Sequence, residues 1–423
     1  MTDVRAFRAL RYDLDRVELS NVIVPPYDVV QPDERAGFYD RDPHNAIRFE
    51  LERDVADDAS TDYAQVAQAL AQWRDSGVLV CDDAPALYVM SQRFQAPSGA
   101  WLERTGFFSE LGLAAYSEGK VLPHERTLAG PKADRLRLLS AARANLSSVF
   151  LLYEDRSQEL EPLLEAAIRN HPLATARDDA GVEYQLAALR GEQAERVSRF
   201  LAGRPTVIAD GHHRYETALA YRDGQRAAGR GLDDPSASTL AFLANAYAEG
   251  SLLLAIHRVI RKVPAPTDAL WDERLPGWDR TRVEMGDGSD IAALIDEHLA
   301  PLRGRPCFAA DDGSGALRIF SRSESLGDRL MVSILEEEVI GSVFGLDAEA
   351  IADGAVTFKK RPEHAAREVR TGDGTVALYL NPVEPDDVFR VSAQGEVMPQ
   401  KSTFFYPKVP TGLVFRLHED AGR

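Results

Sequence analysis

The order of apolar and polar positions predicts a chain in which strands alternate with helices. Apolar residues recur at helical spacing from Tyr63 to Trp73, and Gly77 stands where that helix would end. Strand-like apolar runs are expected at 22–24, 46–51, 86–94, 104–113, 149–153, 205–209, 375–380 and 389–392. Helices are expected at about 130–144, 159–169, 212–226, 290–300 and 329–344. The pattern predicts an α/β (mixed α+β) fold class with mixed strands.

The segment 261–290 is richer in proline, glycine and charge than its surroundings, which is typical of a boundary between domains. With this boundary the chain divides into three portions. They are an N-terminal α/β portion at 1–115, a central portion at 116–260 and a C-terminal α/β portion at 261–423.

Composition narrows the class of protein further. Hydrophobic residues make up 44% and charged residues 27%, as in globular proteins with a buried core. Lys and Arg number 49 and Asp and Glu 67, so the net charge of 49 − 67 = −18 disfavours nonspecific binding of nucleic acid. The two cysteines, Cys81 and Cys307, exclude a disulfide framework. Because neither a signal peptide nor an apolar run of membrane-spanning length occurs, we expect a cytoplasmic protein without membrane contact.

The strongest candidate site follows the predicted strand at 205–209. A strand, a glycine turn and a helix start bring main-chain N–H groups and the positive end of the helix dipole to one point, which attracts anions. The alternative is that the aspartate only caps the helix and the histidines face solvent. Against it, basic side chains crowd a helix end where the dipole disfavours positive charge. The residues of this block are Asp210, Gly211, His212, His213, Arg214 and Tyr215.

Two further segments carry reactive side chains. His124 and Glu125 end an apolar run just before a basic helix start, where Glu125 could act as a general base or be an ordinary surface carboxylate. Lys401, Ser402 and Thr403 offer an ammonium and two hydroxyls to a phosphate, although a plain strand with scattered polar residues fits equally well. In the same way, the Pro-Pro-Tyr-Asp segment at 25–28 either lines a pocket or simply turns the chain.

Four segments, in this order, resemble the signature blocks of a bacterial family labelled as conserved domain of unknown function 1015. They are PPYDVV, VLPHERTLAGPKADRL, ADGHHRYETAL and MPQKSTFFYPKVPTGLVF, and the resemblance spans roughly residues 5 to 417. The Asp-Gly-His-His-Arg block is also similar to the ParB/sulfiredoxin-like superfamily and, within it, to the archaeal free L-serine kinase. The resemblance therefore implies a ParB/sulfiredoxin-like core at 116–260 with large N-terminal and C-terminal additions, the latter returning the Gln-Lys-Ser-Thr loop to the site.

The same resemblance implies a kinase that transfers a phosphoryl group from a nucleotide, expected to be ATP with Mg²⁺, to the hydroxyl of free L-serine, giving O-phosphoserine. The donor stays open among ATP, ADP and pyrophosphate. The implied catalytic residues are Glu125 and His213, and the implied metal ligand is Asp210. The implied phosphate-binding residues are Asp210, Gly211, His212, His213, Arg214, Lys401, Ser402 and Thr403. The implied substrate-binding residues are His124, Arg126 and Tyr27.

Two other functions compete with the kinase. A ParB-like nucleotide switch would hydrolyse nucleotide and act on a macromolecular partner, although the charge of −18 and the lack of a clear helix-turn-helix disfavour DNA. Sulfiredoxin-like repair would need a cysteine near the phosphate block, and Cys81 and Cys307 are remote from it in sequence. The partners expected are thus an amino acid and a nucleotide, and a homodimer is compatible with the sequence.

Overall fold

The computed structural model describes residues 2–54, 61, 63–125, 129–286, 288–399 and 401–418. The chain forms two compact units. Unit 1 comprises Met1–Leu252, Ser392–Val397 and Pro407–Arg423, and unit 2 comprises Leu253–Val391 and Met398–Tyr406. The three predicted portions do not coincide with these units, because strands from 1–115 and from 116–260 share one sheet in unit 1.

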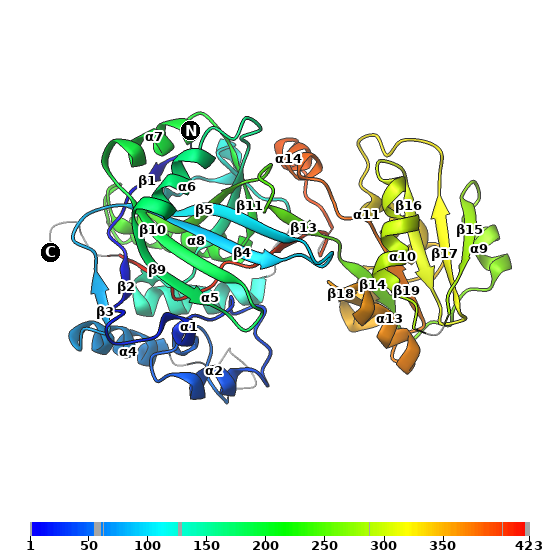
Figure 1. Cartoon of the computed structure of the whole chain (residues 1–423), viewed down its shortest axis with the longest axis horizontal. Coiled ribbons are helices and arrows are strands. Elements are labelled where there is room, and N and C mark those ends of the chain that lie inside the picture. The colour runs from blue at the N-terminus through cyan, green and yellow to red at the C-terminus, as the bar shows by residue number, and fades with distance from the viewer. Residues whose placement is uncertain are drawn as a thin grey trace. The chain divides into compact units, whose positions relative to one another are not determined.

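Unit 1 is built on a mixed sheet to which nine strands of the described residues contribute, in the order β6-β11-β8-β12-β5-β4-β10-β9 with β1 beside β5 (Figure 1). The pairs β6–β11 and β8–β12 are parallel, and β8–β11, β12–β5, β5–β4 and β4–β10 are antiparallel. This arrangement confirms the mixed α/β class. The strands are β1 (Val4–Arg5), β4 (Leu87–Gln95), β5 (Trp101–Gly112), β6 (Val121–Leu122), β8 (Val149–Tyr153), β9 (Pro172–Arg177), β10 (Glu183–Leu189), β11 (Thr206–Asp210) and β12 (Ser238–Asn245).

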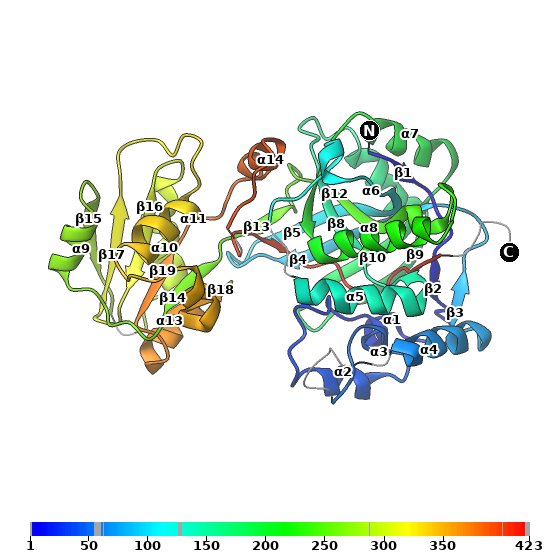
Figure 2. The ribbon, with the colours of Figure 1, turned by 180° about the vertical axis from the view of Figure 1, so that it is seen from behind.

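Helices bury their apolar faces against this sheet. Leu164 and Val197 pack into one core with Phe107, Leu151 and Leu243 of the strands. Figure 2 shows α5 and α8 lying side by side, and α4 packs against α5. The helices are α1 (Leu19–Val22), α2 (Arg35–Arg41), α3 (Ile47–Glu50), α4 (Tyr63–Asp75), α5 (Ala129–Ala142), α6 (Glu161–Asn170), α7 (Gly191–Leu201) and α8 (His212–Ala227), with 3-10 turns η2 (Tyr116–Glu118) and η3 (Pro235–Ala237).

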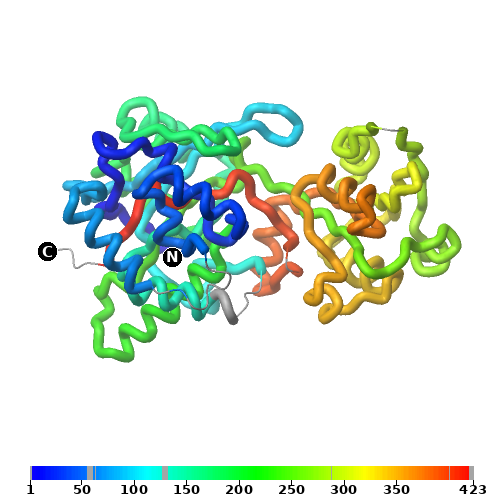
Figure 3. Tube along the Cα trace, turned by 90° about the horizontal axis from the view of Figure 1, so that it is seen from below, coloured from blue at the N-terminus to red at the C-terminus, as the bar shows by residue number. Residues whose placement is uncertain are grey.

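The C-terminal segment is threaded through unit 1 beside the N-terminal one. Thr411 forms a bridge with Val24, and Phe415 forms one with Leu10. Figure 3 shows these red and blue segments running alongside each other. The C-terminal segment also pairs through β21 (Arg416–Leu417) with β7 (Ala144–Asn145). The N-terminal segment pairs through β2 (Leu10–Tyr12) with β3 (Leu79–Cys81). This threading carries residues near 408 to the sheet of unit 1.

Unit 2 contains an antiparallel sheet in the order β15-β17-β16-β19-β14-β18, covered by α10 and α13 through Ile295 and Ala366. The strands of this sheet are β14 (His257–Ile260), β15 (Asp279–Glu284), β16 (Cys307–Asp311), β17 (Ala316–Ser321), β18 (Val356–Lys359) and β19 (Val376–Tyr379), and a separate pair is β13 (Leu252–Leu254) with β20 (Phe404–Tyr406). The helices are α9 (Asp268–Arg274), α10 (Ile291–His298), η4 (Ala300–Leu302), α11 (Met331–Ile334), η5 (Leu335–Gly341), α12 (Ala348–Ala350), η6 (Ile351–Ala355), α13 (Pro362–Thr371) and α14 (Pro385–Ala393).

Three predicted strands are wrong. Of the residues at 22–24, Val22 ends α1 and Val24 forms only an isolated bridge with Thr411. Residues 47–50 form α3, and those at 389–392 lie within α14. The helical turn α3 buries Ile47, Phe49 and Glu50. Over so few positions, the alternation of apolar and polar residues does not distinguish such a buried turn from a strand. Among the described residues, no helix is both long and apolar enough to cross a membrane.

Candidate functional site

The centre of the candidate site is the sharp turn between β11 and α8. Gly211 caps the helix with φ 88°, a left-handed conformation that glycine adopts without strain. A Cβ at this position would lie 2.9 Å from Nε of Arg214. The first hydrogen bond of the helix runs from Tyr215 N to Gly211 O at 3.0 Å, so the N–H groups just before Tyr215 lie outside the helical ladder. The predicted strand, glycine turn and helix start are therefore present, and their use by an anion stays a prediction.

Two cations meet one carboxylate at this turn. Arg214 and Lys408 form ion pairs with the two oxygens of Asp210, and Arg214 also donates to Ser148 O. The side chains of Asp210, Arg214 and Lys408 are only 11%, 11% and 16% exposed. Burial alone would raise the pKa of Asp210, but Lys408 and Arg214 hold it well below its usual range. Asp210 is therefore ionised, and these three side chains carry one surplus positive charge.

Two buried histidines connect this cluster to Glu125. The main-chain N–H of His124 donates to Nε2 of His212 at 3.4 Å, and the two rings lie 4.7 Å apart. His124 Nδ1 lies 2.5 Å from Ile208 O, and because a carbonyl can only accept, Nδ1 carries the proton. Burial lowers the pKa of both histidines, for His212 well below 6.5. Both rings are therefore neutral near pH 7.

Glu125 lies at the edge of the same group. Its Oε1 is 3.8 Å from Nε2 of His124, and its side chain is 22% exposed whereas that of His124 is 1% exposed. The carboxylate is thus within reach of solvent and of a bound molecule, next to a neutral imidazole that can accept a hydrogen bond. The structure brings the Pro-His-Glu block and the Asp-Gly-His-His-Arg block together, as expected.

A second charged cluster lies around Arg135 of α5. Arg135 donates to Glu50 Oε2 at 2.9 Å, and its guanidinium stacks over the ring of Tyr27 at 4.2 Å. Both Glu50 and Arg135 are at most 5% exposed. Burial raises the pKa of Tyr27 to about 12, with Arg135 and Arg214 opposing it, so the Tyr27 hydroxyl keeps its proton at neutral pH. A cavity of 50 Å³ is lined by both Arg135 and Arg214. The Pro-Pro-Tyr-Asp segment therefore lies beside the Asp210 cluster.

The family model matches residues 4–276. This chain belongs to the family described as protein of unknown function DUF1015. The matched stretch contains the Pro-His-Glu and Asp-Gly-His-His-Arg blocks, and the block at 398–408 lies beyond it. No curated protein matches the sequence of this DUF1015 protein.

Solved structures similar to this DUF1015 protein are remote. A conserved hypothetical protein from Pyrococcus furiosus aligns with a TM-score of 0.33 and 13% identity, over 74% of this chain and 95% of its own. A free serine kinase variant in complex with AMP gives 0.35 and 13%, over 73% and 92%. SbnI from Staphylococcus aureus, truncated at its C-terminus, gives 0.36 and 11%, over 75% and 90%. Likenesses this distant carry no inference about the chemistry of the DUF1015 protein.

The remaining predicted residues fall in different places. His213 is half-buried in the first turn of α8 and helps to keep the pKa of His212 low. Arg126 lies outside the described residues. Lys401, Ser402 and Thr403 belong to unit 2, where Lys401 O accepts from Arg258 at 3.3 Å and Ser402 Oγ donates to Pro399 O at 2.6 Å. The predicted role of these three residues at the phosphates stays a prediction.

Lys408 is the site residue that the sequence interpretation missed. It stands five residues after the predicted Lys-Ser-Thr loop, just behind Pro407 and an aromatic run. A lysine placed at the end of a strand-like run could have been noticed, but nothing in the sequence indicates its partner, which lies 198 positions earlier.

The predicted metal ligand does not fit this arrangement. Both oxygens of Asp210 already contact cations, Arg214 and Lys408, and a divalent ion there would have to displace Lys408 against like charge. Among the described residues, no cluster of three or more His, Cys, Asp or Glu side chains has the arrangement of a metal site.

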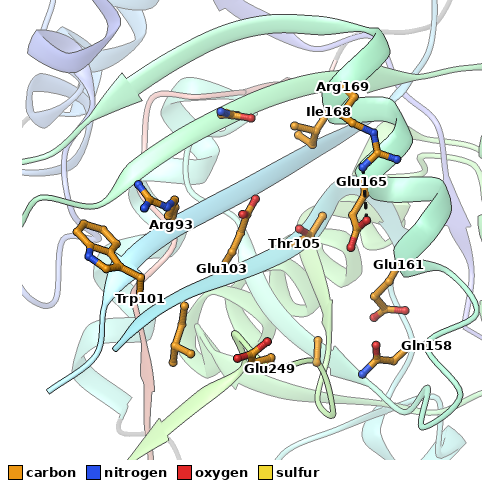
Figure 4. Close-up of a pocket in the computed structure, with 13 residues that line it drawn as sticks. Arg93, Trp101, Glu103, Thr105, Gln158, Glu161, Glu165, Ile168, Arg169 and Glu249 are labelled. Carbon is orange, nitrogen blue, oxygen red and sulfur yellow. Dashed lines mark ion pairs between the residues drawn. The ribbon is translucent and has the colours of Figure 1, made fainter. Parts of the chain in front are cut away.

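A larger cavity, of 670 Å³, lies elsewhere in unit 1 (Figure 4). Carboxylates of Glu103, Glu161 and Glu249 line it, and its two arginines are ion-paired, Arg93 with Glu183 and Arg169 with Glu165. Burial raises the pKa of Glu161. A phosphate chain would be repelled by this lining, so the size of the cavity does not make it the nucleotide site. Its lining residues are Arg93, Trp101, Leu102, Glu103, Thr105, Gln158, Glu161, Glu165, Ile168, Arg169, Gln185, Ala248 and Glu249.

Proposed function

We propose that this DUF1015 protein is a small-molecule kinase that transfers a phosphoryl group from ATP to the hydroxyl of free L-serine, giving O-phosphoserine. The observation that supports it is the adjacency of a solvent-reachable carboxylate, Glu125, to the buried cationic cluster around Asp210. The choice of serine rests on the resemblance of the Pro-His-Glu and Asp-Gly-His-His-Arg blocks to the free serine kinase.

Phosphoryl transfer needs positioning and charge stabilisation more than covalent chemistry from the protein. The serine hydroxyl oxygen bonds to the γ-phosphorus, the bond from that phosphorus to the β–γ bridging oxygen breaks, and ADP leaves. Glu125 accepts the hydroxyl proton as general base. Arg214, Lys408 and the N–H groups at the start of α8 neutralise the phosphate oxygens. His213 borders the same helix start.

The neutral state of His124 and His212 serves this arrangement. A neutral Nε2 on His124 can accept a hydrogen bond from protonated Glu125 after transfer, and a neutral His212 can accept the main-chain N–H that fixes the Glu125 segment. Tyr27, with its hydroxyl protonated at neutral pH, is a suitable donor to the serine carboxylate. Mg²⁺ would arrive on the nucleotide phosphates, and no step is assigned to protein ligands for it.

The test is an assay of the purified chain with ATP and a panel of hydroxyl amino acids, in which ADP and the phosphorylated product are measured by mass spectrometry. Glu125→Gln should lower turnover by about 10²–10⁴-fold because the proton acceptor is lost, while nucleotide affinity stays unchanged. Glu118→Gln is the matched control, since Glu118 is an exposed glutamate paired with Lys120 at 2.6 Å, and its activity should equal wild type.

Two outcomes would contradict the proposal. Full turnover in Glu125→Gln would remove Glu125 from the mechanism. Hydrolysis of ATP at a rate that no amino acid changes would instead favour the nucleotide-switched binding module.

A further inference from the structure

Arg104 of β5 is a buried arginine that forms no ion pair in the described part of the chain, although the charge of Asp210 favours its protonated form. Its side chain is 1% exposed and lies over the rings of Phe150 and Phe242, with its guanidinium carbon 4.6 and 5.8 Å from their centres. Burial lowers the pKa of Arg104 to about 9. A guanidinium buried without an ion pair depends on neutral acceptors for its stabilisation, and Arg104 has two of them, Gln92 and Pro407.

Both acceptors lead to the segment that carries Lys408. Arg104 Nη2 donates to Pro407 O at 2.5 Å, and Arg104 Nε donates to Oε1 of Gln92 at 3.0 Å. Gln92 is fully buried, and its Nε2 donates to Lys408 O at 3.0 Å. The roles are unambiguous, since the guanidinium can only donate and the carbonyls can only accept. Two consecutive carbonyls are thus fixed from the centre of the sheet.

The other end of Lys408 lies in the candidate site. Its ammonium forms an ion pair with Asp210 although its main chain is 198 positions away in sequence. A lysine side chain has four rotatable bonds, and ordering it costs side-chain entropy. Because the peptide groups on both sides of the Lys408 Cα are held, the positions that its ammonium can reach are limited.

We propose that Gln92 and Arg104 are positioning residues that hold Lys408 in the phosphate site. They fix the carbonyls of Pro407 and Lys408, so the ammonium faces Asp210 in the absence of ligand and the phosphate chain of a nucleotide in its presence. Contact of the ammonium with a nucleotide phosphate rests on the proposed function. The holding of Lys408 by Gln92 and Arg104 does not depend on it.

The first measurement follows Lys408 itself. Wild type, Gln92→Leu, Arg104→Met and Gln92→Glu are treated with acetic anhydride, and acetylation of Lys408 is followed by peptide mass spectrometry, with Lys120, which is 35% exposed, as internal reference. Lys408 should react slowly in wild type and at least about tenfold faster in the variants, because weakened pairing exposes the amine. Gln92→Glu keeps an acceptor for Arg104, which favours folding, but cannot donate to Lys408 O.

The second measurement compares the affinities of adenosine and ADP by calorimetry. Their ratio isolates the contribution of the phosphates. It should fall by about tenfold in the variants while adenosine affinity stays constant, since the proposal places Lys408 at the phosphates of the nucleotide and not at the nucleoside. A merely structural defect would weaken both ligands alike.

Arg416→Met is the matched control. Like Arg104, Arg416 is a buried arginine, and it lies on the same C-terminal segment as Lys408. It pairs with Glu110 at 3.3 Å and donates to Pro235 O at 2.9 Å. This variant should lower the melting temperature and leave both Lys408 readouts at wild-type values.

Acetylation of Lys408 at the wild-type rate in all folded variants would overturn the positioning role. If wild type binds no nucleotide, the proposed function fails, while the acetylation result still decides whether Gln92 and Arg104 hold Lys408.

Discussion

The cluster around Asp210 and the cavity of Figure 4 are two polar regions of the same unit with opposite charge. The cluster holds two buried cations for one carboxylate. The cavity measures 670 Å³ and is lined by glutamates whose neighbouring arginines are already paired. In a chain of net charge −18, local cations rather than available volume decide where an anion binds.

The pKa values of two carboxyls show the same contrast. Burial acts on both Asp210 and Glu161 in the same direction, toward a higher pKa. Lys408 and Arg214 reverse this for Asp210, whereas Glu161 has the amide of Asn245 and a backbone N–H against burial, but no cation, and keeps a raised pKa. The cations at Asp210 therefore distinguish the candidate phosphate site from the glutamate-lined cavity.

The largest effect is expected from Arg214→Met. It removes a charge-assisted donor from the cluster, so the affinity for ADP should fall by about 10–100-fold, as calorimetry would measure. The double variant Glu103→Gln, Glu249→Gln in the cavity is the control, and its ADP affinity should equal wild type. Equal losses in both would mean that overall charge, and not the cluster, governs binding.

A smaller effect is expected from Gly211→Ala. The left-handed backbone at φ 88° should cost about 1–2 kcal/mol of unfolding free energy in urea titrations. The added Cβ would also displace the Arg214 side chain, which lies 2.9 Å away, and weaken ADP binding. Gly203→Ala, where a Cβ meets nothing within 4 Å, should change neither quantity. An unchanged stability for Gly211→Ala would show that the turn relaxes.

The local part of this site was predictable from sequence, and the long-range part was not. The apolar run at 205–209, the glycine and the helical pattern after it are consecutive, so the strand, turn and helix follow from local preferences. The prediction that His124 and Glu125 join this block came from a motif resemblance, not from the pattern.

Lys408 shows why the rest could not be predicted. Its place depends on how the C-terminal segment threads past Val24 and Leu10, which is decided by packing in unit 1. Likewise, the strand predicted at 46–51 is a helical turn because tertiary burial overrides a short alternation. Arg104 lies in a correctly predicted strand. The alternation along that strand predicts which face of the sheet carries Arg104, but it does not predict the hydrogen-bond partners, Gln92 and Pro407.

The smallest effects concern pH, where the cluster and the cavity should differ in sign. Folded His212 has a pKa well below 6.5, so the unfolded chain binds the proton first and the free energy of unfolding falls as pH drops through 6.5. Folded Glu161 has a pKa above 4.5, so its contribution falls as pH rises through the range above 4.5. Each slope is at most about 1.4 kcal/mol per pH unit.

Urea unfolding of wild type, His212→Gln and Glu161→Gln between pH 4 and 8 would measure both signs. Relative to wild type, His212→Gln should lose less stability on acidification, because glutamine does not titrate and can still accept the His124 N–H. Glu161→Gln should instead gain stability toward pH 7, because the ionised carboxyl with one unpaired buried oxygen is gone. Other buried histidines, such as His257 and His418 with pKa values of about 3, act equally in all three proteins and cancel in the differences. Parallel curves for the two variants would mean that the cluster and the cavity do not differ electrostatically, and the contrast that supports the proposed phosphate site would be lost.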